Sequence, residues 1–349
     1  MELVRKHSSI ERPTTPLCSI CIAHYQGHEL IAECIESVLA QDCEFSIEII
    51  VHDDASPDGS VAYLLHNYPQ IEILESTKNV GFCIANNRMV EHARGTYVLL
   101  LNNDAALFPD ALSTLANESE QNSTTGILTL PQYDWESDNL VDRGCLLDPF
   151  YNPVPNLDPA RLDVAMVIGA CLWINRTLWC ELGGFPEWFE AIGEDLYLCC
   201  LARLTGKSVH ATTESGYRHR QGHRIGGNKP HLGVLSTTYN RRALSERNKT
   251  FTLLILTPTA CTLPLAALHF LSLIVEGLIL AVASRDLHLL TTVYWATLRS
   301  TLRQRKRILA ERRKVQRQRR CSVSQYAKPF SILPRKLSLL RQYGLPVIR

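Results

Sequence analysis

The chain has 349 residues, a length that indicates about two domains, and with 46% hydrophobic and 20% charged residues it has the composition of a globular protein. Its twelve cysteines are scattered through apolar segments, which argues against a disulfide scaffold, and we interpret the CxxC pair Cys18 and Cys21 as buried core thiols rather than a metal or redox pair. The net charge of +1 hides an asymmetry, because residues 241–349 carry 21 Lys and Arg against 4 Asp and Glu, whereas residues 1–240 carry 15 against 31.

The N-terminal half shows an alternation of short strands and helices. Residues 1–16 are predicted to be a polar tail without the apolar segment of a secretory signal, so the domain that follows is expected in the cytoplasm. Apolar spacing then predicts strands at 18–25, 46–54, 71–76 and 97–102, and helices at 28–41, 60–68 and 82–93. This order is typical of an α/β domain with a mainly parallel, Rossmann-like sheet flanked by helices, which we place at residues 17–230.

Acidic and amide side chains directly follow two of these strands. Asp53 and Asp54 end one strand, and another ends in Asn102, Asn103 and Asp104. Ligands of parallel sheets bind at the carboxyl ends of the strands. Carboxylate and amide oxygens are the ligands of hard cations, which in turn bind phosphates. The sequence therefore predicts a metal and phosphate site at this edge, although Asp104 alone would also suit a helix cap.

A third acidic site follows in the segment AIGEDLYL, where Glu194 and Asp195 begin a predicted helix at 194–205. The three sites, in this order, suit a sugar-nucleotide transferase. Such an enzyme must hold a base or ribose, hold a metal diphosphate, and remove the proton of an acceptor hydroxyl. Acidic residues in the first turn also favour the helix dipole, which is the alternative role of this pair.

The segment between the third and fourth strands carries further polar residues. Asn79-Val-Gly81 is predicted to be a turn that requires the backbone freedom of Gly81. Asparagine has poor helix propensity, so Asn86 and Asn87 inside a helix are expected to face a nucleotide, with an exposed polar face as the alternative.

The pattern is less regular from residue 105 onward. It predicts a helix at 109–120, a strand at 127–133, a surface loop at 134–163, apolar strand residues at 163–176, a short helix at 177–184 and a last strand at 207–212. The polar segment 216–229, which contains His219 and His223, is predicted to be flexible and suited to close over a diphosphate as a lid.

The C-terminal region, residues 231–349, combines an apolar segment at 251–284 with a basic run at 299–320. The apolar segment is long enough to span a bilayer, but Pro258 and Pro264 are expected to break it early. Basic residues on both sides place both flanks in the cytoplasm, which favours a re-entrant hairpin or an in-plane anchor, with a buried helical hairpin as the alternative. Anionic lipid, rather than nucleic acid, is the expected partner of the basic run.

Four segments carry a resemblance to a known family. They are SICIAHYQGHELIAECIESVLAQ, EIIVHDDASPDGS, NVGFCIANNRMVEHARGTYVLLLNND and GACLWINRTLWCELGGFPEWFEAIGEDLYLCCLARLTGKSV. In this order and spacing, residues 17–225 resemble the family 2 inverting glycosyltransferases with the GT-A fold, in a branch similar to bacterial rhamnosyltransferases of surface polysaccharide assembly.

The resemblance implies a set of roles for individual residues. Mg²⁺ or Mn²⁺ would be held by Asp104, with His219 as a further metal ligand or phosphate contact. Asp195 would be the general base, with Glu194 as its alternative or partner. The donor-side residues would be Asp53, Asp54, Asn79, Gly81, Asn86, Asn87, Asn102 and Asn103.

The resemblance also implies substrates and a location. The donor would be a dTDP-, UDP- or GDP-sugar, with dTDP-rhamnose favoured, and the acceptor a lipid-linked or growing saccharide at the cytoplasmic face of the inner membrane. Three positions depart from the family pattern, since Asn102, Pro186 and Tyr197 stand where Asp is common. Asn102 motivates an alternative, a catalytically weakened scaffold of a polysaccharide-assembly complex. A sugar nucleotidyltransferase is disfavoured, because the chain has no Gly-rich N-terminal loop for a triphosphate.

Overall fold

The structure is a computed structural model that describes residues 4–9, 12–121, 125–221, 230–231 and 234–348. It divides into two compact units. The first unit comprises residues 1–144, 155–191 and 207–220, and the second comprises residues 145–154, 192–206 and 221–349. Two short segments from within the predicted catalytic domain, 145–154 and 192–206, are thus grouped with the C-terminal residues.

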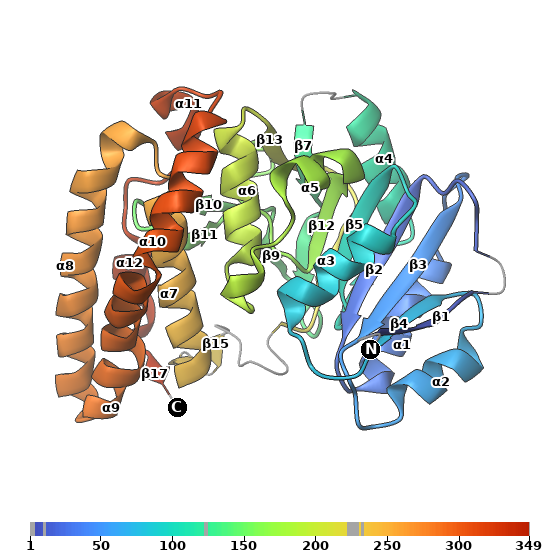
Figure 1. Cartoon of the computed structure of the whole chain (residues 1–349), viewed down its shortest axis with the longest axis horizontal. Coiled ribbons are helices and arrows are strands. Elements are labelled where there is room, and N and C mark those ends of the chain that lie inside the picture. The colour runs from blue at the N-terminus through green and yellow to red at the C-terminus, as the bar shows by residue number, and fades with distance from the viewer. Residues whose placement is uncertain (1–3, 10–11, 122–124, 222–229, 232–233, 349) are drawn as a thin grey trace. The chain divides into compact units, whose positions relative to one another are not determined.

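The first unit is built on an eight-stranded sheet with the order β1-β4-β3-β2-β5-β12-β7-β13 (Figure 1). Its strands are β1 (Val4–His7), β2 (Cys18–His24), β3 (Ile47–Asp53), β4 (Glu72–Ser76), β5 (Tyr97–Asn102), β7 (Thr125–Thr129), β12 (Cys171–Asn175) and β13 (Ser208–Ala211). The four adjacent strands β4, β3, β2 and β5 are parallel, as predicted. The sheet as a whole is mixed, because β12 runs antiparallel to both β5 and β7.

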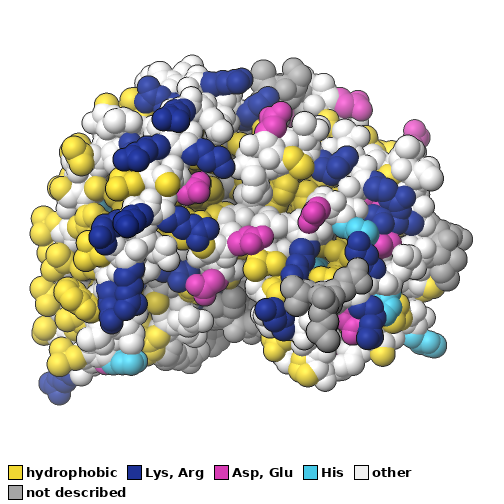
Figure 2. All heavy atoms as spheres, in the orientation of Figure 1, with side chains coloured by type: hydrophobic (Ala, Val, Ile, Leu, Met, Phe, Trp, Pro, Cys, Tyr) yellow, Lys and Arg dark blue, Asp and Glu magenta, His cyan; other side chains and the backbone are white. Residues whose placement is uncertain are grey.

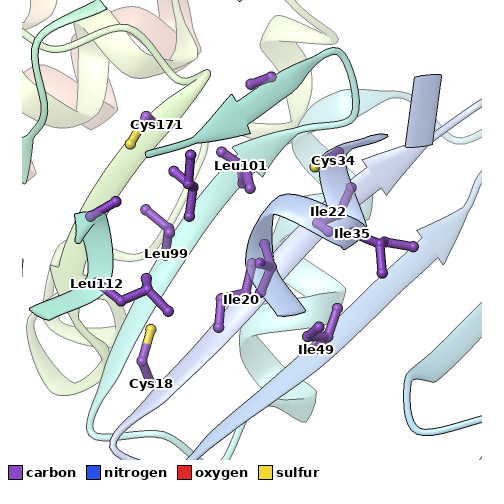
Figure 3. Packing of buried hydrophobic residues seen from close by; sticks show 14 of the residues in the cluster. Cys18, Ile20, Ile22, Cys34, Ile35, Ile49, Leu99, Leu101, Leu112 and Cys171 are labelled. Atoms are coloured by element: carbon purple, nitrogen blue, oxygen red, sulfur yellow. The ribbon is translucent and has the colours of Figure 1, made fainter. Parts of the chain in front are cut away.

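Helices cover both faces of this sheet. They are α1 (His28–Leu39), α2 (Ser60–Asn67), α3 (Phe82–His92), α4 (Ala111–Gln121) and α5 (Arg176–Leu182), followed by the short 3-10 helix η1 (Glu187–Phe189). Alternate residues of the strands, such as Ile20 and Leu99, pack against Ile35 of α1 and Leu112 of α4 in one apolar cluster (Figure 3). Each such side chain, when fully buried, contributes about 1.5–3 kcal/mol. This packing fixes the strands so that β2, β3 and β5 end at the same edge.

The cysteines belong to this interior rather than to disulfides. All twelve lie within the described residues, and all are free thiols. Cys18 and Cys21 are fully buried in β2, and burial raises the pKa of both thiols well above the usual value. The interpretation of the CxxC pair as core thiols is therefore confirmed.

Part of the N-terminal tail is structured. Val4–His7 forms the edge strand β1, antiparallel to β4, although its polar composition gives no sign of a strand. Arg12 donates to the buried carboxylates of Glu48, at 2.7 Å, and Glu72, at 3.1 Å. Paired charges of this kind hold the segment on the domain, which composition alone does not reveal.

A second, four-stranded sheet of the first unit has the order β6-β14-β8-β9. Its strands are β6 (Ala105–Leu107), β14 (Tyr217–His219), β8 (Gln132–Asp134) and β9 (Leu140–Asp142). The prediction of a flexible segment at 216–229 is wrong for its first residues, because Tyr217 and His219 are buried in β14. Residues 222–229, which include His223, lie outside the described residues. The predicted loop at 134–163 contains β9 and the paired strands β10 (Cys145–Leu147) and β11 (Pro153–Pro155).

The second unit is mainly helical. Its helices are α6 (Glu194–Leu204), α7 (Tyr239–Leu256), α8 (Thr259–Ser284), α9 (Leu287–Leu289), the π-helical segment η2 (Leu290–Trp295), α10 (Ala296–Arg317), α11 (Val323–Ala327) and α12 (Arg335–Tyr343). The short strands β15 (Pro230–His231), β16 (Val234–Thr237) and β17 (Val347–Ile348) form a small sheet. Pro258 lies in the break between α7 and α8, as predicted, whereas Pro264 lies inside α8. The second prediction is wrong because one missing backbone bond near the start of a 26-residue helix does not end it.

Candidate active site

The strand register brings the predicted donor-side residues Asp53 and Asn102 to one edge of the first unit. His24, the last residue of β2, is opposite Asp53 of β3, and Ala23 is opposite Asn102 of β5. Three parallel strands therefore end side by side in polar residues. This is the edge at which α/β sheets bind their ligands.

The two aspartates after β3 have different surroundings. Asp53 is buried, and its Oδ1 accepts a hydrogen bond of 2.9 Å from the Ser56 amide. Its Oδ2 is buried with no hydrogen-bond partner among the described residues. Burial raises the pKa of Asp53 above its usual value. A buried acceptor without a donor is unfavourable, so this oxygen is the one that a ligand hydroxyl or N–H would satisfy.

Asp54 instead holds the following loop. Its Oδ1 and Oδ2 accept hydrogen bonds from the backbone amides of Val80, at 2.7 Å, and Gly81, at 2.9 Å. Gly81 has φ +87°, which confirms the predicted need for glycine in this turn. Asn79, two residues before Gly81, is exposed. We therefore assign Asp54 a structural role in holding this loop. The sequence alone did not distinguish this role from that of Asp53.

The asparagines of α3 make contacts within the protein. Asn86 is buried, and its amide donates to the carbonyl of Phe82, one turn earlier. Asn87 donates to the carbonyl of Phe185 and accepts from the amide of the same residue, both at 2.9 Å. The pair thus stabilises the helix and the loop at Phe185, and its role in nucleotide binding stays a prediction.

A cluster at the end of β5 joins residues of β5, β14 and β2 with the turn that follows β5. Nε2 of His219, in β14, lies 3.1 Å from Oδ1 of Asp104 and 3.4 Å from Nδ2 of Asn102. The side chains of His219 and Asp104 are 8% and 13% exposed. Asn103 points its amide nitrogen at Nδ1 of His24, 3.0 Å away. The structure therefore brings Asp104 and His219, the two residues of the metal-site prediction, together with the predicted donor-side residue Asn102.

Gln132 of β8 orients the His219 ring, a role that no sequence motif indicates. Its Oε1 lies 3.1 Å from Nδ1 of His219 and also accepts from the Tyr217 hydroxyl. An amide oxygen can only accept, so Nδ1 of His219 donates to Gln132, and this contact turns Nε2 toward Asp104. Nε2 of Gln132 donates in turn to Asp142, whose pKa is raised by burial to about 7.

These residues fit a divalent cation. Two neighbouring ligands of an octahedral Mg²⁺ site, each about 2.1 Å from the ion, lie about 3 Å apart, which agrees with the His219–Asp104 separation of 3.1 Å. Metal-binding histidines also typically donate their second ring N–H to an oxygen acceptor, as Nδ1 does here. Within the described part of the chain no three His, Cys, Asp or Glu side chains converge, so the remaining ligands would be substrate oxygens and water.

The acidic pair Glu194 and Asp195 begins α6 in the second unit. Glu194 is buried, and its Oε2 has no hydrogen-bond partner among the described residues. Burial and the Asp195 carboxylate raise the pKa of Glu194 well above the usual value. Arg241 of α7 carries the positive charge that acts on both carboxylates. Tyr197, where the family often has Asp, is buried in the same helix.

The parallel strands with acidic ends, the flanking helices and the mixed sheet define the first unit as a GT-A-like fold, the fold of one large class of sugar-nucleotide transferases. Residues 19–179 match the family model described as "Glycosyl transferase family 2". This part of the chain is therefore similar to the family 2 glycosyltransferases.

One curated relative and two solved structures are similar to the chain. A chondroitin synthase of Escherichia coli is 30% identical over 201 residues, which cover 56% of this chain and 28% of that protein. A mannosyltransferase of Pyrobaculum calidifontis, solved with GDP-Man and Mn²⁺, superposes with a TM-score of 0.50 at 17% identity, over 90% of this chain and 85% of that one. GalNAc-T7, solved with UDP, GalNAc and Mn²⁺, gives a TM-score of 0.56 at 14% identity, over 69% and 48%. The two structures support the fold alone.

Proposed function

We propose that the protein is an inverting hexosyltransferase that uses a nucleotide-diphosphate sugar and a divalent cation to extend a lipid-linked or growing saccharide. The observation that carries this proposal is the Asn102–Asp104–His219 cluster at the end of β5, with the His219 ring oriented by Gln132. The match to a polysaccharide synthase and the fold shared with nucleotide-sugar enzymes support the substrate class.

Asp104 and His219 would hold Mg²⁺ or Mn²⁺, which when bound would neutralise the charge of the departing diphosphate. The first 240 residues carry an excess of acidic groups, so an anionic donor is not attracted by the domain as a whole. Local binding of the diphosphate therefore depends on this cluster. The free Oδ2 of Asp53 would accept from a base N–H or a ribose hydroxyl.

Asp195 is proposed as the general base. The proton of the acceptor hydroxyl would pass to its carboxylate while the acceptor oxygen bonds to the anomeric carbon. The bond from that carbon to the phosphate oxygen would break on the opposite side, and the nucleoside diphosphate would leave with the electron pair. The configuration is inverted because a single displacement occurs. Glu194 is buried and its pKa is raised, so it would be the protonated partner of this base.

Nucleotide binding tests the proposal directly. A thermal-shift panel of dTDP-rhamnose, UDP-glucose and GDP-mannose, each with and without Mn²⁺, should show one nucleotide that raises the melting temperature only with metal, because a ligand that binds the native state stabilises it. We favour dTDP-rhamnose from the resemblance to rhamnosyltransferases. The absence of a shift with all three, in folded protein, would contradict the proposal and favour the scaffold function.

We further propose that α8 attaches the protein to the cytoplasmic face of the inner membrane. It is the one helix in the described residues that is long and apolar enough to cross a membrane. One stripe of α8, including His269, Leu273 and Gly277, is buried. The opposite stripe exposes large apolar side chains, with Leu263 82% and Val282 77% exposed, and Figure 2 shows hydrophobic side chains gathered over this helix. Apolar surface of this extent is typical of membrane or protein contacts.

Two observations favour an in-plane attachment over a span. Glu276 on α8 pairs with Arg242 of α7 and Lys336 of α12, and these charges would enter the bilayer if α8 crossed it. Figure 2 shows Lys and Arg side chains beside the hydrophobic side chains of α8. The basic residues that α10 exposes are Arg299, Arg303, Arg305, Lys306, Arg307, Arg313, Lys314 and Arg317. Each Lys or Arg near an anionic surface adds about 1 kcal/mol of attraction. We therefore propose an anionic phospholipid surface as the partner.

Vesicle flotation checks this attachment. The double variant Leu271→Glu and Leu278→Glu should bind phosphatidylserine-containing vesicles at least about tenfold more weakly, because burying one leucine contributes about 1.5–3 kcal/mol. Leu65→Glu, an exposed leucine of α2, is the matched control and should bind normally. Undiminished flotation of the double variant would contradict the proposal. Dimerisation that is lost in the double variant would instead assign the stripe to a second copy of the chain.

A further inference from the structure

The turn that leads into the acidic pair has an unfavourable backbone conformation. Ile192 has φ +66° and Gly193 has φ +88°, both in the left-handed region. Glycine adopts this region freely, but a β-branched residue such as isoleucine rarely does. Such a conformation persists only where surrounding contacts hold it, and it is often found next to functional residues.

Asn248 of α7 makes the contact that holds this turn. Its Nδ2 donates a 2.7 Å hydrogen bond to the carbonyl oxygen of Ile192. Asn248 is 0% exposed, and its Oδ1 accepts from Nε of Arg247 at 2.9 Å, so the amide orientation is fixed at both ends. The donor thus fixes the peptide group between Ile192 and Gly193, the two residues with left-handed backbone.

The same helix also supplies charge to the pair. Arg241 lies seven residues, or about two turns, before Asn248 and therefore on the same side of α7. Its guanidinium interacts electrostatically with Asp195 and Glu194. The beginning of α6 is thus held by α7 in two ways, through the backbone of the turn and through the charge of the carboxylates. All of these residues belong to the second unit.

We infer that Asn248 is a positioning residue for the acceptor-activating base, holding the Ile192–Gly193 turn so that α6 starts at Glu194 and presents Asp195 in a fixed direction. The inference rests on the proposed role of Asp195. It assigns part of the catalytic arrangement to α7, outside the segment that matches the family model. A displaced base transfers protons poorly even when donor binding is intact, and a misplacement of about 1 Å lowers a rate by roughly a hundredfold.

The test uses Asn248→Asp, which has the same shape but no N–H donor. Hydrolysis of UDP-glucose, GDP-mannose and dTDP-rhamnose with Mn²⁺ is followed by release of the nucleoside diphosphate. We expect kcat to fall about ten- to a hundredfold, the donor KM to stay within twofold, and the pH profile of kcat to shift. Asn248→Ala provides the same comparison without a buried carboxylate. Thr252→Val, which removes a buried hydrogen bond one turn further along α7, is the control for stability alone.

Two further measurements separate the possible failures. Hydrogen exchange of a peptide spanning 190–196 should be faster in Asn248→Asp than in Thr252→Val, whether or not the donor is known. Adding Ile192→Gly to Asn248→Asp should restore part of kcat, because glycine needs no restraint at this φ. Unchanged exchange, or unchanged kcat with faster exchange, would overturn the inference. If the wild-type protein hydrolyses none of the three donors, the proposed function fails, while the exchange comparison still decides whether Asn248 holds the turn.

Discussion

Replacing Asp104 with asparagine should lower Mn²⁺-dependent donor hydrolysis by at least about a hundredfold. A bound metal contributes several kcal/mol to stabilising the charge of the departing diphosphate, and each 1.4 kcal/mol is about tenfold in rate. Asparagine removes the only carboxylate within 3.5 Å of His219 Nε2 among the described residues, while it leaves the size of the side chain unchanged. The loss should therefore come from metal affinity and not from unfolding.

Two readouts check this prediction. Mn²⁺ affinity, measured by electron paramagnetic resonance without substrate, should fall together with hydrolysis. Asp138→Asn is the matched control, because it removes one negative charge from the same unit at an exposed ion pair with Arg218. Equal losses in the two variants would mean that net charge, not metal ligation, explains the effect. Hydrolysis that needs no metal in the wild-type protein would refute the metal role outright.

Replacing Asp195 with asparagine should lower kcat by about 10²–10⁴-fold, the range typical of general acid–base catalysis. The metal-dependent thermal shift with the nucleotide should remain, since the donor-side residues lie in the first unit. A loss of nucleotide binding in this variant would contradict the role of base. Steady-state kinetics and the thermal-shift panel together give the answer.

Glu194→Gln is the matched comparison for this variant. Burial raises the pKa of Glu194 in the wild-type protein to about 8. Near neutral pH glutamine therefore imitates the protonated form, and the loss of kcat should be much smaller than in Asp195→Asn. A carboxyl group with a raised pKa in the folded state stabilises the protein at low pH and loses that contribution as pH rises through the folded pKa. As pH rises from about 4.5 to about 8, wild type should therefore lose stability that Glu194→Gln keeps. A larger kcat loss in Glu194→Gln than in Asp195→Asn would move the role of base to Glu194.

The parallel centre of the sheet and its polar edge can be predicted from sequence because both depend on local patterns. Apolar runs of strand length alternate with helical spacing, and parallel strands connected by helices must end at one edge. Asp53, Asn102 and Asp104 therefore come together whatever the details of packing. The turn at Gly81 is equally local, since it follows from backbone sterics alone.

The parts that the sequence does not reveal depend on distant partners. The antiparallel direction of β12 is set by its neighbours β5 and β7 and not by its own apolar residues. Gln132 is a single glutamine after a proline, and only the strand pairing of β8 with β14 places it beside His219. Asp53 and Asp54 have the same side chain and adjacent positions, so their separate roles depend on whether the amides of Val80 and Gly81 are within reach.

The grouping of α6 with the C-terminal helices also affects how the protein is made. Ten of the eleven residues of α6 are buried, and it packs against α7 and α10. On the ribosome, α6 emerges together with the rest of the transferase domain, but its covering helices are translated only later. A nascent chain at that stage exposes an apolar helix, and such surfaces are recognised by chaperones and are prone to aggregation. Premature termination before α7 would thus leave the donor-side sheet attached to an exposed apolar helix that is prone to aggregation.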